Sequence, residues 1–137
     1  MQQIKSKVNG SITHIIQRVD DIQSERDNLV DDKEFLQVSS HKLPVKKFRA
    51  HYHFCKDASE HWQITQEAWV VIAGAVKFTA YDVDNTLLEQ HDLFPGDCVI
   101  CLYGGHNYEV LEPNTIVYEF KTGPYDGVAN DKDFIND

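Results

Sequence analysis

Long apolar runs are missing from this chain of 137 residues. No stretch reaches the roughly 18 consecutive apolar residues that a membrane-spanning helix requires, so we expect no membrane span. The first residues, MQQIKSKVNGSITHII, also lack the apolar core and the small-residue cleavage site of a secretory signal peptide. We therefore expect a cytoplasmic protein.

Positive charge is scarce. Lys and Arg total 13 against 22 Asp and Glu, which leaves a formal net charge of −9. A nucleic-acid-binding surface needs a basic stripe that neutralises phosphates, and anionic lipids attract similar clusters. The one basic cluster, KLPVKKFR at Lys42–Arg49, is local. We therefore expect neither nucleic acid nor a membrane as a partner.

Cysteine is also rare. Cys55, Cys98 and Cys101 make an odd number in a chain without an expected export signal, so reduced thiols are predicted. Cys98 and Cys101 have the spacing of a redox or zinc-binding pair, but they lie in CVICLY, which is typical of a strand. Residues three apart on a strand face opposite sides, so we interpret both as thiols that pack in the core.

From Glu34 onwards the chain contains many short segments in which apolar and polar residues alternate. The segments FLQVSSHKL, KFRAHYHF, VKFTAYD, CVICLY and TIVYEFKT are separated by turn sequences such as DVDN and PGD. Short strands at such regular spacing are typical of an antiparallel sandwich or barrel. We predict a single all-β domain in which residues 34–122 form the barrel. Residues 1–33 would pack on it as an N-terminal segment, and residues 123–137 would form a C-terminal arm.

The segment RAHYHF, Arg49–Phe54, holds the first candidate site residues. On a strand, residues i and i+2 share a face, so Arg49, His51 and His53 would point together into a polar cavity. Two imidazoles can bind a divalent metal when other segments add ligands, and a carboxylate suits Mn, Fe, Ni or Zn. Glu67 and His106 are the candidates, because Glu67 opens the apolar run EAWVVIAG and His106 follows two glycines.

These motifs resemble those of the cupin family. Its first motif, G-x5-H-x-H followed by a short spacer and E-x6-G, matches His51, His53, Glu67 and Gly74. Its second motif ends in a histidine after a glycine-rich turn and matches PGDCVICLYGGH, which ends at His106. The resemblance covers Val45–Lys121. The spacer after His53 is expanded here to FCKDASEHWQITQ, which contains a further histidine, His61.

The resemblance implies a jelly-roll barrel of two antiparallel sheets that binds one divalent metal ion (Fe, Mn, Ni or Zn). Its ligands would be His51, His53, Glu67 and His106, with His61 as an alternative to His53.

Arg49 would clamp a carboxylate or phosphate of a substrate, or remain solvated. Tyr108 shares a face with His106 and would donate a proton or fill space. Cupin barrels commonly pair through the outer sheet, so a homodimer is expected. The remaining histidines, His14, His41 and His91, have no partner in the pattern and are expected in solvent.

Two function classes follow from these residues. The first is a metal-dependent enzyme that acts on a small polar molecule, sugar-like or a carboxylate. Its chemistry would be isomerase, epimerase or lyase chemistry, with the metal as a Lewis acid, or iron-dependent dioxygenation. The second is a non-enzymatic barrel that binds a sugar or a small acid. An interaction protein with incidental histidines is a third reading, and the fold alone does not choose among them.

Overall fold

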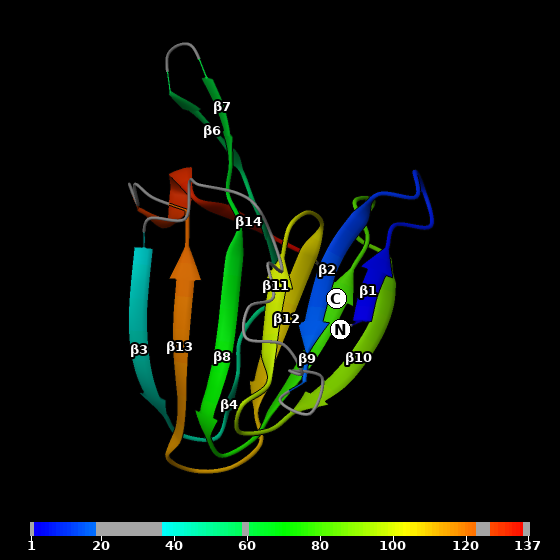
Figure 1. The fold of residues 1–137 in the computed structure, drawn as a ribbon. Coiled ribbons are helices and arrows are strands. Elements are labelled where there is room, and N and C mark those ends of the chain that lie inside the picture. Colours follow the sequence, from blue (N-terminus) through cyan, green and yellow to red (C-terminus); the bar gives the residue numbers. More distant parts are fainter. Residues whose placement is uncertain (1, 19–36, 59–60, 123–126, 136–137) are drawn as a thin grey trace, which may run out of the picture.

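The computed structural model describes residues 2–18, 37–58, 61–122 and 127–135. These residues form two antiparallel β-sheets that face each other, and a two-stranded sheet beside them (Figure 1). The strands of the first sheet are β1 (Gln2–Lys5), β2 (Ile12–Gln17), β3 (Gln37–Leu43), β8 (Glu67–Ala73), β11 (Cys98–Cys101) and β13 (Thr115–Lys121). Those of the second are β4 (Lys46–Lys47), β5 (His51–His53), β9 (Val76–Tyr81), β10 (Leu87–Leu93), β12 (Gly105–Val110) and β14 (Lys132–Phe134).

The spatial order is β1-β2-β11-β8-β13-β3 in the first sheet and β10-β9-β12-β5-β14 in the second, where β4 pairs with β12. Neighbours in the chain, such as β8 and β9, lie in different sheets, so the chain crosses repeatedly between the two layers. The predicted all-β fold with a double antiparallel sheet is confirmed. Among the described residues, no helix has the length and apolar character needed to cross a membrane.

The main core lies between the two sheets. Buried side chains of the first sheet, such as Ile16, Trp69 and Val71, form one cluster with Phe78 and Tyr108 of the second. Each large apolar side chain buried in this way contributes about 1.5–3 kcal/mol. The sheets therefore stay together through side chains that alternate inward along each strand.

The two cysteines of the CxxC spacing lie on opposite faces of β11, as the strand period predicts. Cys101 is buried in the main core, whereas Cys98 packs against a smaller cluster of Ile15, Ala68 and Ile100 on the other face of the first sheet. Both thiols are free. A redox or zinc pair would require the two sulfur atoms on the same side.

The N-terminal segment contributes two strands to the first sheet. β1 pairs with β2, and β2 pairs with β11, so residues 2–5 and 12–17 extend the sheet that continues through β8. Sequence reasoning treated residues 1–33 as a segment outside the barrel strands. Residues 19–36 lie outside the described part of the chain.

The segment expected as one alternating strand over KFRAHYHF is divided in two. β4 ends at Lys47 and β5 begins at His51. Between them, Phe48 N donates to Tyr108 O, and Ala50 O accepts from Ile135 N. β4 therefore pairs with β12 alone, whereas β5, which begins after three residues, pairs with both β12 and β14.

The expanded spacer between His53 and Glu67 forms a hairpin of its own. β6 (Cys55–Ala58) pairs with β7 (His61–Ile64) and with no strand of the two large sheets in the described part of the chain. Figure 1 shows this hairpin projecting beyond the end of the barrel. At its base, Thr65 Oγ1 donates to Phe54 O at 2.7 Å. The insertion therefore leaves β5 and β8 in their own sheets.

Gly74 is the glycine of the E-x6-G motif, and the backbone at this position requires a glycine. It ends β8 at a φ of 81°, a left-handed conformation that favours glycine. A Cβ atom on Gly74 would also collide with Thr115 Oγ1. The tight turn at this point returns the chain from the first sheet to β9 in the second.

Candidate metal centre

The two sheets bring the four predicted metal ligands together. β5 supplies His51 and His53, β12 supplies His106 directly opposite His51, and β8 begins with Glu67 in the facing sheet. One donor atom from each of these residues lies within 4.8 Å of the other three. Metal–nitrogen and metal–oxygen bonds of about 2.0–2.2 Å need only small shifts to span that separation.

Hydrogen bonds orient two of the three imidazole rings, those of His51 and His53. His51 Nδ1 donates to Arg49 O at 2.8 Å, which leaves the Nε2 lone pair available. His53 Nδ1 faces Asp131 Oδ2 at 3.2 Å, and its Nε2 lies 3.1 Å from Glu67 Oε2. His106 Nε2 lies 3.3 Å from Glu67 Oε1. Outer hydrogen bonds of this kind fix ring orientation in metal sites.

Burial keeps two of the histidines neutral. Burial, together with a smaller effect of the nearby His106, lowers the pKa of His51 to about 3. Burial also lowers the pKa of His106, more than the attraction of Glu67 raises it. Neutral imidazoles are the form in which histidine binds metals.

His53 and Glu67 are buried next to each other, and each shifts the pKa of the other. Burial disfavours the charge on His53, but hydrogen bonds to Asp131 and Glu67 outweigh it and raise the pKa of His53. Burial likewise acts to raise the pKa of Glu67, but His106 and His53 outweigh it and hold that pKa well below its usual range. The His53 ring therefore lies between two carboxylates, and its Nε2 position is the one that a metal ion would take.

The donor set fits a divalent metal. His106 is fully buried, and neither of its ring nitrogens has a hydrogen-bond partner among the described residues. Glu67 Oε1 lies 3.3 Å from His106 Nε2, but the two atoms do not form a hydrogen bond. A buried polar atom without a partner costs about 1–3 kcal/mol. Three imidazoles and one carboxylate are a ligand set suited to Fe, Mn, Ni or Zn. A metal ion would satisfy both His106 Nε2 and the carboxylate.

Sequence reasoning missed three residues of the site, Lys121 at the end of β13 and Asp131 and Lys132 in the C-terminal segment. β14 pairs with β5, so Lys132 lies opposite His53 in register. Asp131, just before β14, is buried and accepts hydrogen bonds from His53 and Lys121 through the same oxygen, Oδ2. These hydrogen bonds outweigh burial and lower the pKa of Asp131. Asp131 lies 78 residues from His53 in the sequence, so no local spacing indicated the pair.

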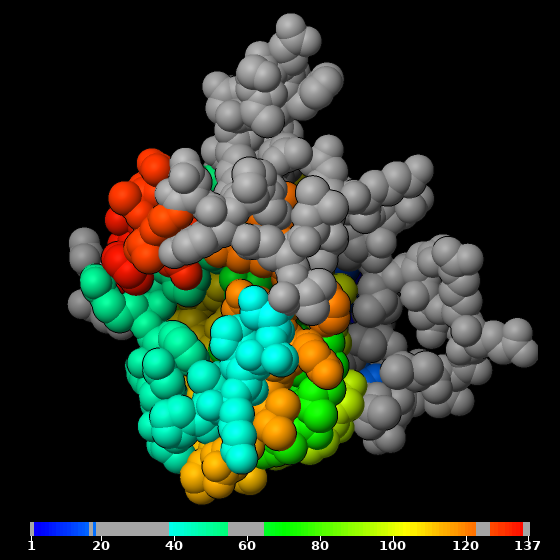
Figure 2. Space-filling model, turned by 90° about the vertical axis from the view of Figure 1, so that its left-hand side faces the viewer, coloured from blue at the N-terminus to red at the C-terminus, as the bar shows by residue number. Residues whose placement is uncertain are grey.

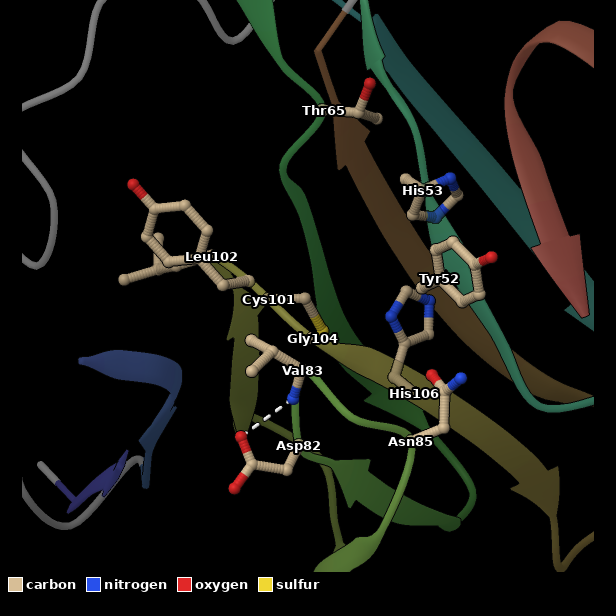
Figure 3. A pocket seen from close by; sticks show the side chains of 11 residues that line it. Tyr52, His53, Thr65, Asp82, Val83, Asn85, Cys101, Leu102, Gly104 and His106 are labelled. Atoms are coloured by element: carbon tan, nitrogen blue, oxygen red, sulfur yellow. Dashed lines mark hydrogen bonds between the residues drawn. The ribbon is translucent and has the colours of Figure 1, made fainter. Parts of the chain in front are cut away.

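A cavity of about 310 Å³ adjoins the metal centre. His53 and His106 both line it, so two of the four donors face the same space (Figure 3). Hydroxyl and amide side chains of Tyr52, Thr65 and Asn85 contribute polar groups to its wall. Its volume is at the lower end of the range for small-molecule pockets, about 300–1,000 Å³.

The other predicted site residues lie around this centre. The Arg49 guanidinium is exposed and stacks 3.9 Å from the centroid of the Phe134 ring, outside the four-donor cluster. Tyr108 is buried, stacks on Trp69 at 3.9 Å between centroids, and contacts Cys101 Sγ through its hydroxyl at 3.7 Å. His61, the alternative to His53, lies in β7, and its side chain is outside the described part of the structure.

No protein-family model and no curated protein matches this chain. Solved structures do match. An RmlC epimerase from Mycobacterium tuberculosis is 15% identical over 98% of this chain and 73% of its own, with a TM-score of 0.63. A dTDP-6-deoxy-D-glucose-3,5-epimerase RmlC from Legionella pneumophila, in complex with dTDP-4-keto-L-rhamnose, is 17% identical over 77% of this chain and 56% of its own, with a TM-score of 0.57. The 3,4-ketoisomerase QdtA from Thermoanaerobacterium thermosaccharolyticum, in complex with TDP-4-keto-6-deoxyglucose, is 10% identical over 88% and 86%, with a TM-score of 0.57.

The chain has a cupin fold. The resemblance drawn from the histidine and glutamate motifs is confirmed at the level of the fold. At these identities the likeness establishes the architecture alone, and this chain covers little more than half of the Legionella chain. What it binds and catalyses has to be argued from its own residues.

Proposed function

We propose that this cupin binds one divalent metal ion through His51, His53, Glu67 and His106 and acts on a small polar molecule in the adjoining cavity. The observation that carries this proposal is the state of His106. It is fully buried beside the Glu67 carboxylate, and its two ring nitrogens lack hydrogen-bond partners among the described residues. A metal ion is the simplest group that would satisfy the Nε2 atom of His106 and the Glu67 carboxylate together.

The reaction that this site supports best is isomerisation or epimerisation of a carbonyl compound. A divalent ion in this position would supply a Lewis acid for a carbonyl or hydroxyl oxygen of the substrate. His53 lies at the cavity wall with Asp131 behind it, so a metal ion held at its Nε2 would lie next to a molecule bound in the cavity. The similar structures of two epimerases and a ketoisomerase support this choice over dioxygenation.

Metal analysis tests the proposal directly. Protein purified without chelators or metal-affinity columns would be compared with a Glu67→Ala, His106→Ala double variant by inductively coupled plasma mass spectrometry. A Glu89→Ala, His91→Ala variant is the matched control, because it removes the same residue types from exposed and half-buried positions of β10. We expect about one equivalent of Fe, Mn, Ni or Zn in the wild type and control, and none in the site variant.

The identity of the metal then directs the search for turnover. Zinc, manganese or nickel leads to screens of sugar and keto-acid isomerases and lyases, and iron adds oxygen-consumption assays. No metal in the wild type, even after reconstitution, would overturn the metal site. Binding without turnover would favour the alternative, a non-enzymatic barrel that holds a sugar or small acid.

We also propose that this cupin is a cytoplasmic homodimer that pairs through the outer face of the first sheet. This face carries the apolar cluster of Ile15, Ala68 and Ile100, and Ile72 and Tyr118 are exposed on the neighbouring strands. Static light scattering at micromolar concentration checks the dimer. A monomer mass under those conditions would contradict it.

A further inference from the structure

Lys132 places an ammonium group beside the metal centre. It lies opposite His53 in the register of β14 and β5, and its Nζ is 3.5 Å from His51 Nε2, the nitrogen that would bind the metal. Its side chain is 22% exposed, whereas the side chains of His53, Glu67 and His106 are almost fully buried. A small molecule from solvent can therefore reach this ammonium without displacing a metal ligand.

Among the described residues, and with His53 neutral as metal binding requires, the charged side chains in contact with the four donors cancel before a metal is added. Glu67 and Asp131 supply two carboxylates, and Lys121 and Lys132 supply two ammonium groups in contact with these residues or with His51. Glu119, the next acid on the same sheet face, accepts a hydrogen bond from Trp69 and lies 3.8 Å from His41. A divalent ion would therefore add positive charge to a buried site, which is costly without a counter-charge.

From this balance we propose that the metal centre and Lys132 together bind the carboxylate of a small organic acid. One carboxylate oxygen would face the metal, and the other would accept a charge-assisted hydrogen bond from Lys132 Nζ, which is released from His51 once Nε2 binds the metal. The inference rests on the proposed metal site. It narrows the ligand class from sugar-like or carboxylate to a small carboxylate.

The shape of the molecule agrees with such a ligand. Figure 2 shows the surface hollowed between β3 and the segment of β4 and β5, beside the C-terminal segment drawn in red. This is the side on which β14 pairs with β5.

A matched pair of probes tests the proposal. Glycolate carries one carboxylate next to a hydroxyl, and glycolamide is its neutral counterpart of nearly equal size. Protein loaded with Co²⁺ would be titrated with each probe by isothermal calorimetry, and the visible absorption of the cobalt would report changes at the metal. We expect wild-type protein to bind glycolate at least about tenfold more tightly than glycolamide.

Three variants assign the effect to Lys132. Lys132→Met should keep one equivalent of cobalt and bind glycolate at least about tenfold more weakly than the wild type, while Lys132→Arg recovers part of the loss. Without glycolate, Lys132→Met should bind cobalt more tightly, because a neighbouring positive charge is gone. Lys5→Met, which removes an exposed lysine from β1, should match the wild type in both titrations.

The outcomes separate the two proposals. Equal glycolate affinity in the wild type and in cobalt-loaded Lys132→Met overturns the carboxylate site and leaves the metal site standing. Glycolamide binding as tight as glycolate binding overturns it as well. Failure of the wild type to bind cobalt or any other divalent ion overturns the metal site, and the carboxylate site with it.

Discussion

At the scale of single residues, the site depends on groups that are buried in a neutral or paired state. His51 and His106 are held neutral by burial, while Asp131 and Glu67 raise the pKa of His53 against the effect of burial. The same physical conditions that make these residues good metal ligands make the folded protein sensitive to acid, since unfolding frees buried histidines to take up protons.

His14 provides a test of this sensitivity outside the four donors. It is fully buried, and its Nε2 lies 3.1 Å from Gly105 O and its Nδ1 2.9 Å from Thr13 Oγ1. Burial lowers its pKa from 6.5 to about 3. Below pH 6.5 the unfolded chain therefore binds a proton that the folded protein does not, so stability falls as the pH drops toward 3.

We predict that His14→Gln weakens this pH dependence. Between pH 6.5 and 3, one such histidine lowers the free energy of unfolding by up to about 1.4 kcal/mol for each pH unit that the pH falls. Urea unfolding of both proteins at pH 7, 6 and 5, with EDTA present to exclude metals, measures the free energy of unfolding. The other buried histidines remain in both proteins, so the difference between the two slopes reports His14. Parallel slopes would contradict the prediction.

At the scale of elements, the hairpin of β6 and β7 is separable from the barrel. Its two strands pair with each other, and the chain enters and leaves it at neighbouring points, Phe54 and Thr65. Because a long insertion in a surface loop costs little loop-closure free energy, the spacer can expand without moving His53 or Glu67.

We predict that replacing residues 55–64 by a short Gly-containing turn preserves the barrel and the metal site. Circular dichroism should remain that of an all-β protein, and the metal content should stay near one equivalent. Loss of metal with an intact fold would show that the hairpin takes part in the site, and would favour His61 as a ligand.

The C-terminal segment is an element that the site requires. β14 brings Asp131 and Lys132 beside β5, and Ile135 is buried against Gly105 and bonds to Ala50 O through its backbone N–H. Ile135 thereby explains the glycine that precedes His106, because a Cβ atom on Gly105 would collide with it.

Truncation after Thr122 tests this role. We expect a lower melting temperature and metal affinity reduced by about 10–100-fold, the range for loss of an outer hydrogen-bond partner of a metal ligand. A chain that ends after Ile135 is the control and should behave as the full protein does. Full metal affinity in the shorter chain would contradict the role assigned to Asp131.

For the whole molecule, metal binding and folding are coupled. The donors come from β5, β8 and β12, which belong to two different sheets, so the complete set exists only in the folded protein. A ligand that binds only the folded state stabilises it by about 2.7 kcal/mol at 100 times its dissociation constant.

We therefore predict that the preferred metal raises the melting temperature by about 10 °C for a chain of this size. Differential scanning fluorimetry with increasing metal concentration measures the shift. Glu67→Gln, which keeps the size of the side chain and removes its charge, should lose most of the shift. The same shift in both proteins would place the stabilising ion somewhere else.

The sequence by itself determined the fold class and the four candidate metal ligands. Strand periodicity predicted an antiparallel sandwich or barrel and the opposite faces of Cys98 and Cys101, because those properties depend on side chains two or three residues apart. The jelly roll of two sheets was what the resemblance implied. The motifs around His51, Glu67 and His106 were also local, and the structure brings them together as the resemblance implied.

Only the tertiary structure decided which other residues surround the metal centre. Asp131, Lys132 and Lys121 meet His53 and His51 through the pairing of β14 with β5, and β1 and β2 complete the first sheet through β11. His14 was expected in solvent but is buried, because β2 lies inside that sheet and not beside it. Pairing between distant strands depends on the whole core, whose contacts no local pattern records.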